Sequence, residues 1–381
     1  MGACAPGSFA AILSMSSILV FVMLGALSVL LCYHLFIFSR LAFRKQTRVL
    51  VRDLPISVVV CARNEARALE RLVPILMDQD HLDFEVVVVN DRSEDDTAEI
   101  LEWMKPKFPR LRVVNIQADE KFSYGKKIAL GVGVRAAKHP HLLLTDADCV
   151  PVGRDWVASM ASGFNDRRHI VIGHSPYERQ ATLTNLLERY DGIAKAVQFI
   201  SFAQAGLPYM GVGRNLGYTH EVFFNARGPR RHNHLMSGDD DLFINEVARA
   251  RNTSAVADPR SFMTTRATGD LTTWMRRKRR HYTTARYYRF GHQVLLTLLP
   301  LARIVFWCAC AMLFALGHWR EAGAGLFVKV GLFLPVTLLS MRRLGADPLL
   351  LTLALPLEWL FLVLEPLIYV STLVIKPRRW K

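Results

Sequence analysis

Two carboxylates that could share a metal ion stand two positions apart in the middle of the chain. Asp146 and Asp148 directly follow the apolar segment His141–Thr145. Carboxylate oxygens at this spacing can bind one hard divalent cation, and Mg²⁺ or Mn²⁺ favours such oxygens together with the phosphates of a substrate. A solvated turn is the ordinary alternative for an isolated Asp-x-Asp pair, so the surroundings must decide between the two.

A second acidic cluster lies further along the chain, in Ser237–Leu242. It holds three adjacent carboxylates, Asp239, Asp240 and Asp241, in a chain whose formal net charge is +15. Adjacent carboxylates repel one another, which favours a functional role or a nearby counter-charge. One of them could be the general base that deprotonates a sugar hydroxyl, and a solvated helix cap is the alternative.

Three further polar segments adjoin the expected strands and helices. Residues 61–65 and Asn90–Thr97 each follow an apolar run, whereas Gly125–Lys127 opens a helical pattern. All three could simply be helix starts, because short polar side chains satisfy free amides there. The functional alternative is a nucleotide pocket, in which Asp91 accepts from a base or ribose and Lys126 binds phosphate at a helix N-terminus.

Two other segments allow more than one interpretation. Gly211–Asn215 is rich in glycine but lacks the spacing of a phosphate-binding fingerprint, so its backbone could approach an acceptor instead. The basic run Arg276–Arg280 could clamp a diphosphate leaving group, lie on anionic lipid, or act as a topogenic signal. Its place beside apolar segments argues against nucleic acid as a partner. We interpret His232 and His234 as surface residues rather than as a metal pair.

The elements that must position these residues alternate between strands and helices. Three apolar, β-branched runs predict strands, at 56–60, 85–90 and 141–145. Helical patterns separate them, at 65–77, 95–105 and 126–138. This alternation predicts an α/β fold whose sheet is covered on both faces. Ligands on such sheets bind beyond the carboxyl ends of the strands, which is where the polar clusters fall.

Apolar segments flank this region on both sides. No Asp, Glu, Lys or Arg precedes Arg40, and the run 9–38 is long enough to cross a bilayer. Basic residues follow at once, so the positive-inside rule predicts a cytoplasmic domain. Three more apolar segments lie at 294–317, 322–340 and 348–375. Four crossings would place the basic tail outside, against the same rule, so one segment is expected to lie in the interface or to form a hairpin.

The composition agrees with a charged domain joined to membrane helices. Fifty-one per cent of the residues are hydrophobic, which excludes a disordered chain. The six cysteines form no CxxC pair, so neither a disulfide framework nor a zinc site is expected. We divide the chain into an N-terminal transmembrane helix with a basic juxtamembrane segment (1–50), an α/β domain (51–290) and a membrane region with two to four helices (291–381).

Taken in order, these segments resemble the membrane-bound glycosyltransferases of family 2. The resemblance covers about residues 55–290 and lies in Ala62–Glu65, Val89–Thr97, Gly125-Lys126, Thr145–Cys149, Gly213–Asn215, Ser237–Leu242 and Arg276–Arg280. It implies a GT-A fold, a Rossmann-like mixed sheet, for the α/β domain. It also implies a nucleotide-sugar donor of UDP or GDP type, a Mg²⁺ or Mn²⁺ ion, and inverting transfer in a single displacement.

The family motifs imply roles for individual residues. Asp91 matches the carboxylate that meets the nucleotide, Asp146 the donor-side member of the Asp-x-Asp motif, and Asp148 its metal ligand. Asp239 matches the general base, with Asp240 as the close alternative. The other donor-binding residues would be Ala62, Arg63, Asn64, Glu65, Lys126 and Arg276, and the acceptor-binding residues Gly213, Arg214 and Asn215.

The basic run departs from the family pattern. Many processive members carry Gln-x-x-Arg-Trp here, whereas this chain has Arg276 for Gln, keeps Arg279, and has Arg280 for Trp. Arg279 is therefore expected to stabilise the diphosphate leaving group during catalysis. The absent Trp weakens the case for a processive polysaccharide synthase.

We therefore expect an inverting, metal-dependent hexosyltransferase in the plasma (inner) membrane, with a lipid-linked or membrane-proximal glycan acceptor at the cytoplasmic face. Two alternatives stay open. One is a processive synthase, and the other is a non-catalytic scaffold or transport component in which Arg303, Lys329, Glu358 and Glu365 mark a polar pathway. The sequence leaves open the sugar, the nucleotide base, the acceptor and the oligomeric state.

Overall fold

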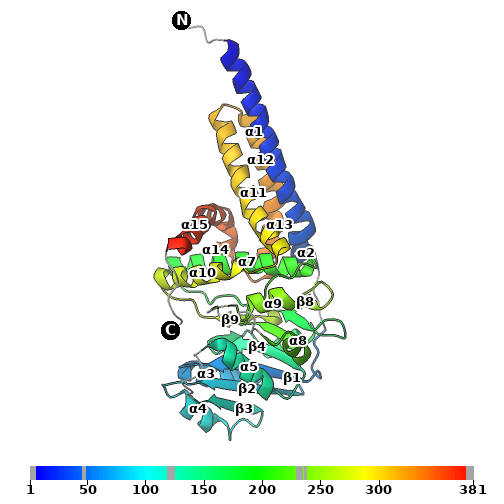
Figure 1. Cartoon of the computed structure of the whole chain (residues 1–381), viewed down its shortest axis with the longest axis vertical. Helices are drawn as coiled ribbons and strands as arrows, with labels where there is room; N and C mark the ends of the chain where they lie inside the picture. Colours follow the sequence, from blue (N-terminus) through cyan, green and yellow to red (C-terminus); the bar gives the residue numbers. More distant parts are fainter. Residues whose placement is uncertain (1–5, 45–48, 118–124, 229–234, 236–237, 375–381) are drawn as a thin grey trace.

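The structure is a computed structural model that describes residues 6–44, 49–117, 125–228, 235 and 238–374, with side chains between residues 15 and 372 of these ranges. Figure 1 shows a wide α/β domain at one end and a long stem of helices at the other. Two helices, α7 (Leu183–Gln204) and α10 (Leu271–Ala285), lie between the domain and the stem.

A seven-stranded mixed sheet forms the centre of the domain. Its strand order is β3–β2–β1–β4–β7–β6–β8, and the first four strands run parallel. Ile56 of β1 pairs with Phe84 of β2 and with His141 of β4, so the carboxyl ends of these strands reach the same edge. The strands are β1 (Ile56–Ala62), β2 (Phe84–Asp91), β3 (Leu111–Ile116), β4 (His141–Asp146), β6 (Ile170–Ile172), β7 (Leu216–Thr219) and β8 (Thr253–Ala255).

The predicted parallel strands and their helices are confirmed. The helices are α3 (Ala66–Met77), α4 (Thr97–Met104) and α5 (Lys126–Ala136). The sequence did not predict the antiparallel part, in which β7 pairs with β4 and β6, nor the small second sheet of β5 (Cys149–Pro151) and β9 (Met263–Thr265). These strands have three or four residues each, too few to show a hydrophobic period.

Both faces of the parallel strands are buried, as their continuous apolar sequences predict. Along β1, Val58 and Val60 belong to the core that includes α3 and α4, whereas Val59 belongs to the core that includes α5. A Cβ atom on Gly133 of α5 would lie 2.6 Å from the Val59 side chain, so glycine permits this close approach. Three short helices complete the domain, α6 (Trp156–Ala161), α8 (His220–Asn225) and α9 (Asp241–Val247).

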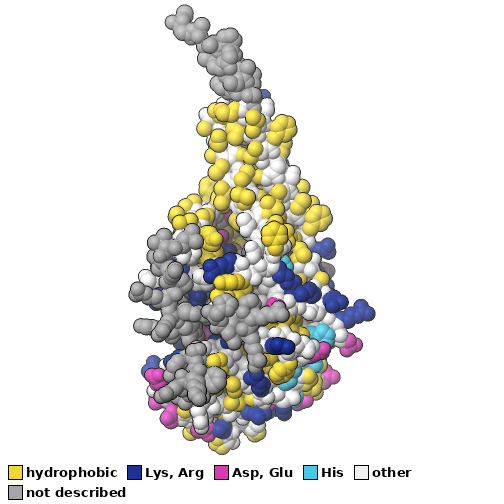
Figure 2. Space-filling view, in the orientation of Figure 1, with side chains coloured by type: hydrophobic (Ala, Val, Ile, Leu, Met, Phe, Trp, Pro, Cys, Tyr) yellow, Lys and Arg dark blue, Asp and Glu magenta, His cyan; other side chains and the backbone are white. Residues whose placement is uncertain are grey.

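The stem consists of three mutually packed helical passes. The first is α1 (Pro6–Cys32), which continues through a π-helical segment, Tyr33–Phe38, into α2 (Ser39–Phe43). The second is α11 (Phe290–Ala315). The third joins α12 (Trp319–Val328), a π-helical segment and α13 (Leu334–Arg343). Contacts between α1, α11 and α12 hold the passes together, and Figure 2 shows that apolar side chains cover this narrow part of the molecule.

A fourth long apolar helix does not join the upper stem. After α14 (Pro348–Thr352), α15 (Ala354–Val374) packs against α10, α7 and α11 beside the base of the stem (Figure 1). By length and composition, four helices could cross a membrane: Met15–Phe43, Phe290–Ala315, Trp319–Arg343 and Ala354–Thr372. The packing of α15 therefore separates three passes that run along the stem from one helix that stays at its base.

Candidate functional site

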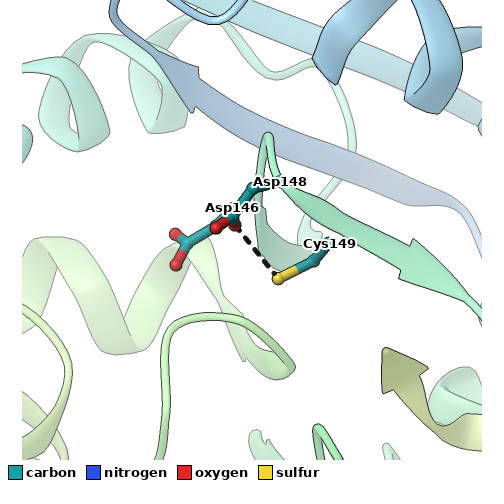
Figure 3. Close-up of side chains that lie close together, drawn as sticks. All are labelled: Asp146, Asp148 and Cys149. Carbon is teal, nitrogen blue, oxygen red and sulfur yellow. Dashed lines mark hydrogen bonds between the residues drawn. The ribbon is translucent and has the colours of Figure 1, made fainter. Parts of the chain in front are cut away.

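The Asp-x-Asp pair lies at the edge where the parallel strands end. Asp146 is the last residue of β4, and Asp148 sits in the turn that leads into β5. Ligand atoms of Asp146, Asp148 and Cys149 all lie within 4.8 Å of one another (Figure 3). The Cys149 thiol donates to Asp148 Oδ1 at 3.4 Å, and burial raises its pKa, so it stays protonated at neutral pH.

Lys126 connects this pair to the second acidic cluster. It is the first residue of α5, and its Nζ lies 2.5 Å from Asp146 Oδ1 and 3.7 Å from Asp239 Oδ2. Burial opposes the charged form, but the carboxylates of Asp146, Asp239 and Asp240 raise the pKa of Lys126 well above its usual value. A fixed positive charge therefore stands between carboxylates from two distant parts of the chain.

The three adjacent aspartates have different surroundings. Asp240 accepts from the Gly213 amide at 2.8 Å and from the Asp241 amide at 2.7 Å, and it caps α9. Asp241 is buried and accepts from the hydroxyls of Thr284 at 2.5 Å and Tyr288 at 3.0 Å. The hydrogen bonds of Asp240 and Asp241 thus stabilise the start of α9 and its contacts with Gly213, Thr284 and Tyr288.

Asp239 is the member that meets the Lys126 charge. Burial, with the nearby carboxylates of Asp240 and Asp146, raises its pKa against the opposing effect of Lys126. A raised pKa makes the carboxylate a stronger base once it is ionised.

Asp91 belongs to the same edge of the sheet. It is the last residue of β2, its side chain is 4% exposed, and the Arg92 guanidinium lies 2.7 Å from its Oδ1. The pKa of the Cys61 thiol, near the end of β1, is affected by the charged side chains close to it. Burial raises its pKa to about 12, and charges on Lys126, Asp146, Asp239 and Asp91 act on it as well. The four predicted side chains are therefore neighbours in space.

The loops after β1 and β2 are bound to each other. The Asn64 amide donates to Ser93 Oγ at 2.9 Å, and Asn64 Oδ1 accepts from the Glu94 amide at 2.8 Å. The Glu65 amide donates to Thr97 Oγ1 at 3.0 Å, at the start of α3. Asn64 and Ser93 therefore tie the two loops together rather than cap helices, since the N-cap residues of α3 and α4 are Glu65 and Asp96 and neither makes a side-chain cap bond.

Glu65 is also close to the Asp-x-Asp pair. Burial, together with the carboxylates of Asp148, Asp146 and Asp95, raises the pKa of Glu65 to about 7. The Asp146 and Asp148 carboxylates suit a Mg²⁺ or Mn²⁺ ion, and a divalent cation there would also relieve their repulsion with Glu65. Of the predicted neighbours, Ala62 is buried at the end of β1, and Arg63 is part-buried beside it.

Basic side chains face the carboxylates from two directions. Arg214 lies over the Tyr177 ring, 4.9 Å from its centroid. Arg277 Nη1 donates to Tyr177 Oη and to Glu188 Oε1, at 3.3 Å each. Burial alone would raise the pKa of Asp146, but Lys126, Arg214 and Arg277 lower it. Lys126, Arg214 and Arg277 therefore provide positive charge near Asp146, which suits the binding of a diphosphate group.

The basic side chains of α10 point toward different neighbours. Arg279 turns toward α15, where its Nε donates to Ser371 Oγ at 2.9 Å, and Arg276 is exposed. Arg277 and Arg280, with His281, are spaced i, i+3 and i+4, so they share one face of α10. His281 is exposed. Arg277, Arg280 and His281 therefore have the spacing of the Gln-x-x-Arg-Trp pattern, one residue later than predicted.

The predicted acceptor residues separate into different roles. The Asn215 side chain is fully buried, accepts from Trp156 Nε1 and donates to the carbonyls of His174 and Ser261. The charge of Arg214 lowers the pKa of Asp146, and the Gly213 amide donates a hydrogen bond to Asp240 Oδ2. His232, His234 and Ser237 lie outside the described residues. Sequence reasoning missed Tyr177 and Glu188, which carry no motif.

Comparison with known proteins places the domain in a family. Residues 57–212 match the family described as glycosyl transferase family 2. A probable glycosyltransferase, YdaM of Bacillus subtilis, is 29% identical over 36% of this chain and 35% of its own length. An uncharacterized glycosyltransferase of Rickettsia bellii is 22% identical over 34% of this chain and 18% of its own length. The chain therefore matches only a minor part of either relative.

A solved structure shows the same fold over nearly the whole chain. The mannosyltransferase PcManGT from Pyrobaculum calidifontis, in complex with GDP-Man and Mn²⁺, aligns with a TM-score of 0.57 at 18% identity. The alignment covers 87% of this chain and 99% of that chain. The α/β domain thus has a GT-A fold, and its residues 57–212 match glycosyltransferase family 2.

Proposed function

We propose that the chain transfers a sugar from a UDP- or GDP-type donor to a lipid-linked or membrane-proximal acceptor. The observation that carries the proposal is the Lys126 ammonium between Asp146 and Asp239, which joins the Asp-x-Asp pair to the second acidic cluster. The structural neighbour PcManGT, which holds GDP-Man and Mn²⁺, supports a nucleotide-sugar donor.

The donor is proposed to lie along the carboxyl ends of β1, β2 and β4. Asp91 would accept hydrogen bonds from the nucleoside, with the loop around Glu65 beside it. The diphosphate would face Arg214 and Arg277, which already act on Asp146. Arg280 shares the helical face of Arg277, so we assign the diphosphate contact to these residues in place of Arg276 and Arg279.

A divalent ion would be held by Asp148 with Asp146, and it would supply Lewis-acid stabilisation of the departing diphosphate. The residues of the chain provide the remaining chemistry. Arg277 and Arg214 present fixed donors toward developing negative charge, in a part-buried site where such donors act strongly. Lys126 keeps Asp146 and Asp239 close together while both are ionised.

Asp239 is proposed as the general base. It would take the proton of the acceptor hydroxyl as that oxygen attacks the anomeric carbon from the face opposite the diphosphate, which inverts the configuration. Asp240 is the alternative, but its two oxygens already accept from the Gly213 and Asp241 amides. Asp241 is bound to α10 by Thr284 and Tyr288.

The stem is proposed to anchor the enzyme in the plasma (inner) membrane, with the α/β domain at the cytoplasmic face. Arg40 and Arg44 lie at the domain end of the first pass, which fits the positive-inside rule. Three stem passes, with α15 at the base, would leave the basic tail on the cytoplasmic side. This arrangement supports residues 1–50 and 291–381 as membrane regions around a catalytic unit at 51–290.

The test is a donor panel with the purified full-length protein. Nucleotide sugars are incubated with Mg²⁺ or Mn²⁺, and release of nucleoside diphosphate is measured. One donor should be turned over by the wild type and not by Asp148→Asn, while Asp166→Asn, which changes an exposed carboxylate, should match the wild type. Turnover that is unchanged in Asp148→Asn, or no turnover of any donor in the presence of membrane lipid extract, would contradict the proposal.

A further inference from the structure

Three ionisable side chains from three separate apolar helices meet inside the helical region. Lys329 Nζ lies 3.0 Å from Glu358 Oε1, and Arg303 Nε lies 3.8 Å from the same oxygen. The side chains of Lys329, Glu358 and Arg303 are 7%, 18% and 32% exposed. We call these three residues the stem cluster. It contains two cations and one carboxylate, and the proposed catalytic site does not use it.

The position of Arg303 makes this imbalance costly. Arg303 lies near the middle of α11, roughly 20 Å from its first residue at about 1.5 Å per residue. Leu301 and Leu298 on the same helix are exposed, as expected for a helix that faces lipid. A cation at this depth normally has an anionic partner or a polar cavity. Within the described part of the chain, the ion pairs of Arg303 and Lys329 both end on Glu358.

A neutral donor beside the cluster also lacks an acceptor. Trp307 is one turn after Arg303, its Nε1 is buried, and no described group accepts from it. Lys329 Nζ lies 5.4 Å from the centroid of the Trp307 ring, so this donor belongs to the same place. Trp359, next to Glu358, packs edge-on against Trp307 with ring centroids 4.8 Å apart. Donors therefore outnumber acceptors around Glu358, which favours a ligand rich in acceptor oxygens.

Two π-helical segments adjoin the cluster. One is Tyr33–Phe38 in the first pass, and the other is Lys329–Phe333 in the third. They face each other, because the His34 ring stacks on Phe333 with centroids 4.4 Å apart. A π-helical turn shifts the phase of the helix after it, and such turns are frequent at functional sites. Lys329 is the first residue of the segment Lys329–Phe333, so the π-helical distortion of the third pass begins at the buried cation that pairs with Glu358.

A line of charged side chains joins the stem cluster to the catalytic domain. Glu365 lies two turns after Glu358 on α15, and its Oε1 is 2.8 Å from Lys195 Nζ of α7 and 3.7 Å from Lys278 Nζ of α10. Lys278 directly precedes Arg279 and follows Arg277, the residue that faces Asp146. The polar face of α15 therefore runs from the stem toward the proposed diphosphate site.

We propose that Arg303, Lys329 and Trp307 bind the phosphate group of a membrane lipid. A phosphate would add negative charge and acceptor oxygens where Arg303 and Lys329 share one carboxylate oxygen and Trp307 Nε1 has no described acceptor. The acyl or prenyl chain of the lipid would lie along the exposed apolar side of α11. The inference rests on the proposed membrane location. It goes beyond the proposed function, because a phosphate held by Arg303 lies in the stem, away from Asp239 and the donor site.

The experiment measures lipid binding to the full-length protein. Detergent-purified, delipidated protein is titrated with a polyprenyl monophosphate or, separately, with phosphatidylglycerol, and bound lipid is counted by native mass spectrometry. Arg303→Gln should weaken binding about tenfold or more, as expected for the loss of a charge-assisted hydrogen bond. Arg320→Gln, which removes a cation near the start of α12, is the matched control and should bind like the wild type.

Glu358→Gln gives a prediction of opposite sign. It removes the carboxylate that competes for both cations, so lipid phosphate should bind several-fold more tightly. This variant decides the question alone if Arg303→Gln does not fold. Equal binding by the wild type and Arg303→Gln, or weaker binding by Glu358→Gln, would overturn the proposal and leave the cluster as a structural tie between helices.

The two lipids distinguish the source of the phosphate. Binding of the polyprenyl monophosphate alone supports a stem site selective for prenyl lipids, and binding of phosphatidylglycerol supports a site for membrane phospholipids. Binding of neither lipid by the wild type overturns the proposal. The readout does not need turnover, so a protein that binds lipid through Arg303 but turns over no donor would contradict the proposed function only.

Discussion

The assignment of the diphosphate contact to one face of α10 can be tested with two arginines that stand two positions apart. Arg277 faces Asp146 and is held by Tyr177 Oη and Glu188 Oε1, whereas Arg279 bonds Ser371 on α15. Arg277→Gln and Arg279→Gln remove the same charge from the same helix. The two variants differ in the direction that each side chain faces, and Arg277→Gln also removes the ion pair with the buried Glu188 carboxylate, so the stability of both variants is measured.

The expected effect of Arg277→Gln follows from the loss of a charged donor to the leaving group. A hydrogen bond to a charged group contributes about 1.5–3 kcal/mol, and each 1.36 kcal/mol changes a rate about tenfold. We therefore expect kcat/KM for the donor to fall about 10- to 150-fold. Arg279→Gln removes a part-buried bond to a hydroxyl outside the site, and kcat/KM should stay within about threefold of the wild type.

The assay is the initial rate of nucleoside diphosphate release over a range of donor concentrations, at a saturating concentration of the metal ion. Thermal denaturation of both variants shows whether the fold is intact. If Arg279→Gln loses as much activity as Arg277→Gln, or if Arg277→Gln retains activity within threefold, the assignment of faces is wrong.

Three further predictions concern the acidic cluster. Asp239→Asn should lower the transfer rate about 10²- to 10⁴-fold, which is the usual contribution of a general base. The Kd of the nucleoside diphosphate, measured by calorimetry, should change less than threefold. An equal loss of binding would indicate that Asp239 binds the donor instead. In the wild type, kcat/KM should fall as the pH decreases through the raised pKa of Asp239, since the base must be ionised, and a flat profile between pH 5 and pH 8 would contradict this role. Asp241 has a pKa raised to about 7 by burial and by Asp240, so the protonated form is favoured in the folded state. The stability that the protonated Asp241 side chain contributes is complete below the ordinary carboxyl pKa and is lost as the pH rises through about 7. Asp241→Asn should therefore show a smaller decrease in Tm between pH 5 and pH 8 than the wild type. An equal decrease would refute this.

The parallel half of the sheet could be predicted because its strands are long and continuously apolar. Ile56–Ala62 and Phe84–Asp91 show the composition of strands buried on both faces, and the helices between them have clear periods. Once these strands are parallel, their carboxyl ends must share an edge. The meeting of Asp91 with Asp146 therefore follows from topology, without knowledge of any side-chain conformation.

The phase of the basic helix could not be read from the sequence. Five consecutive basic residues look alike, and only the packing of α10 on α7 and α15 decides which of them faces the site. The burial of Asn215, in the segment Gly213–Asn215, could not be predicted from the sequence for a related reason. Asn215 stands beside the site in sequence, but its amide group holds Trp156 and two carbonyls in the core.

The packing of the fourth apolar helix could not be predicted without the tertiary structure. Length and hydropathy make 354–372 a candidate span like the other three segments. Glu358 and Glu365 place a polar face on α15, and this face binds cations of the stem, α7 and α10. The helix is therefore held at the base of the stem by ion pairs whose partners lie far away in the sequence.

The central claim is that Asp146, Asp148 and the donor diphosphate form one site, and calorimetric titration of Mn²⁺ tests it most directly. Mn²⁺ is titrated into the full-length protein with and without saturating GDP or UDP. The nucleotide should tighten Mn²⁺ binding about 5- to 150-fold, the usual range of coupling between bound ligands, and the coupling should disappear in Asp148→Asn but not in Asp166→Asn. Mn²⁺ binding that is independent of both nucleotides, or coupling that persists in Asp148→Asn, would contradict the account.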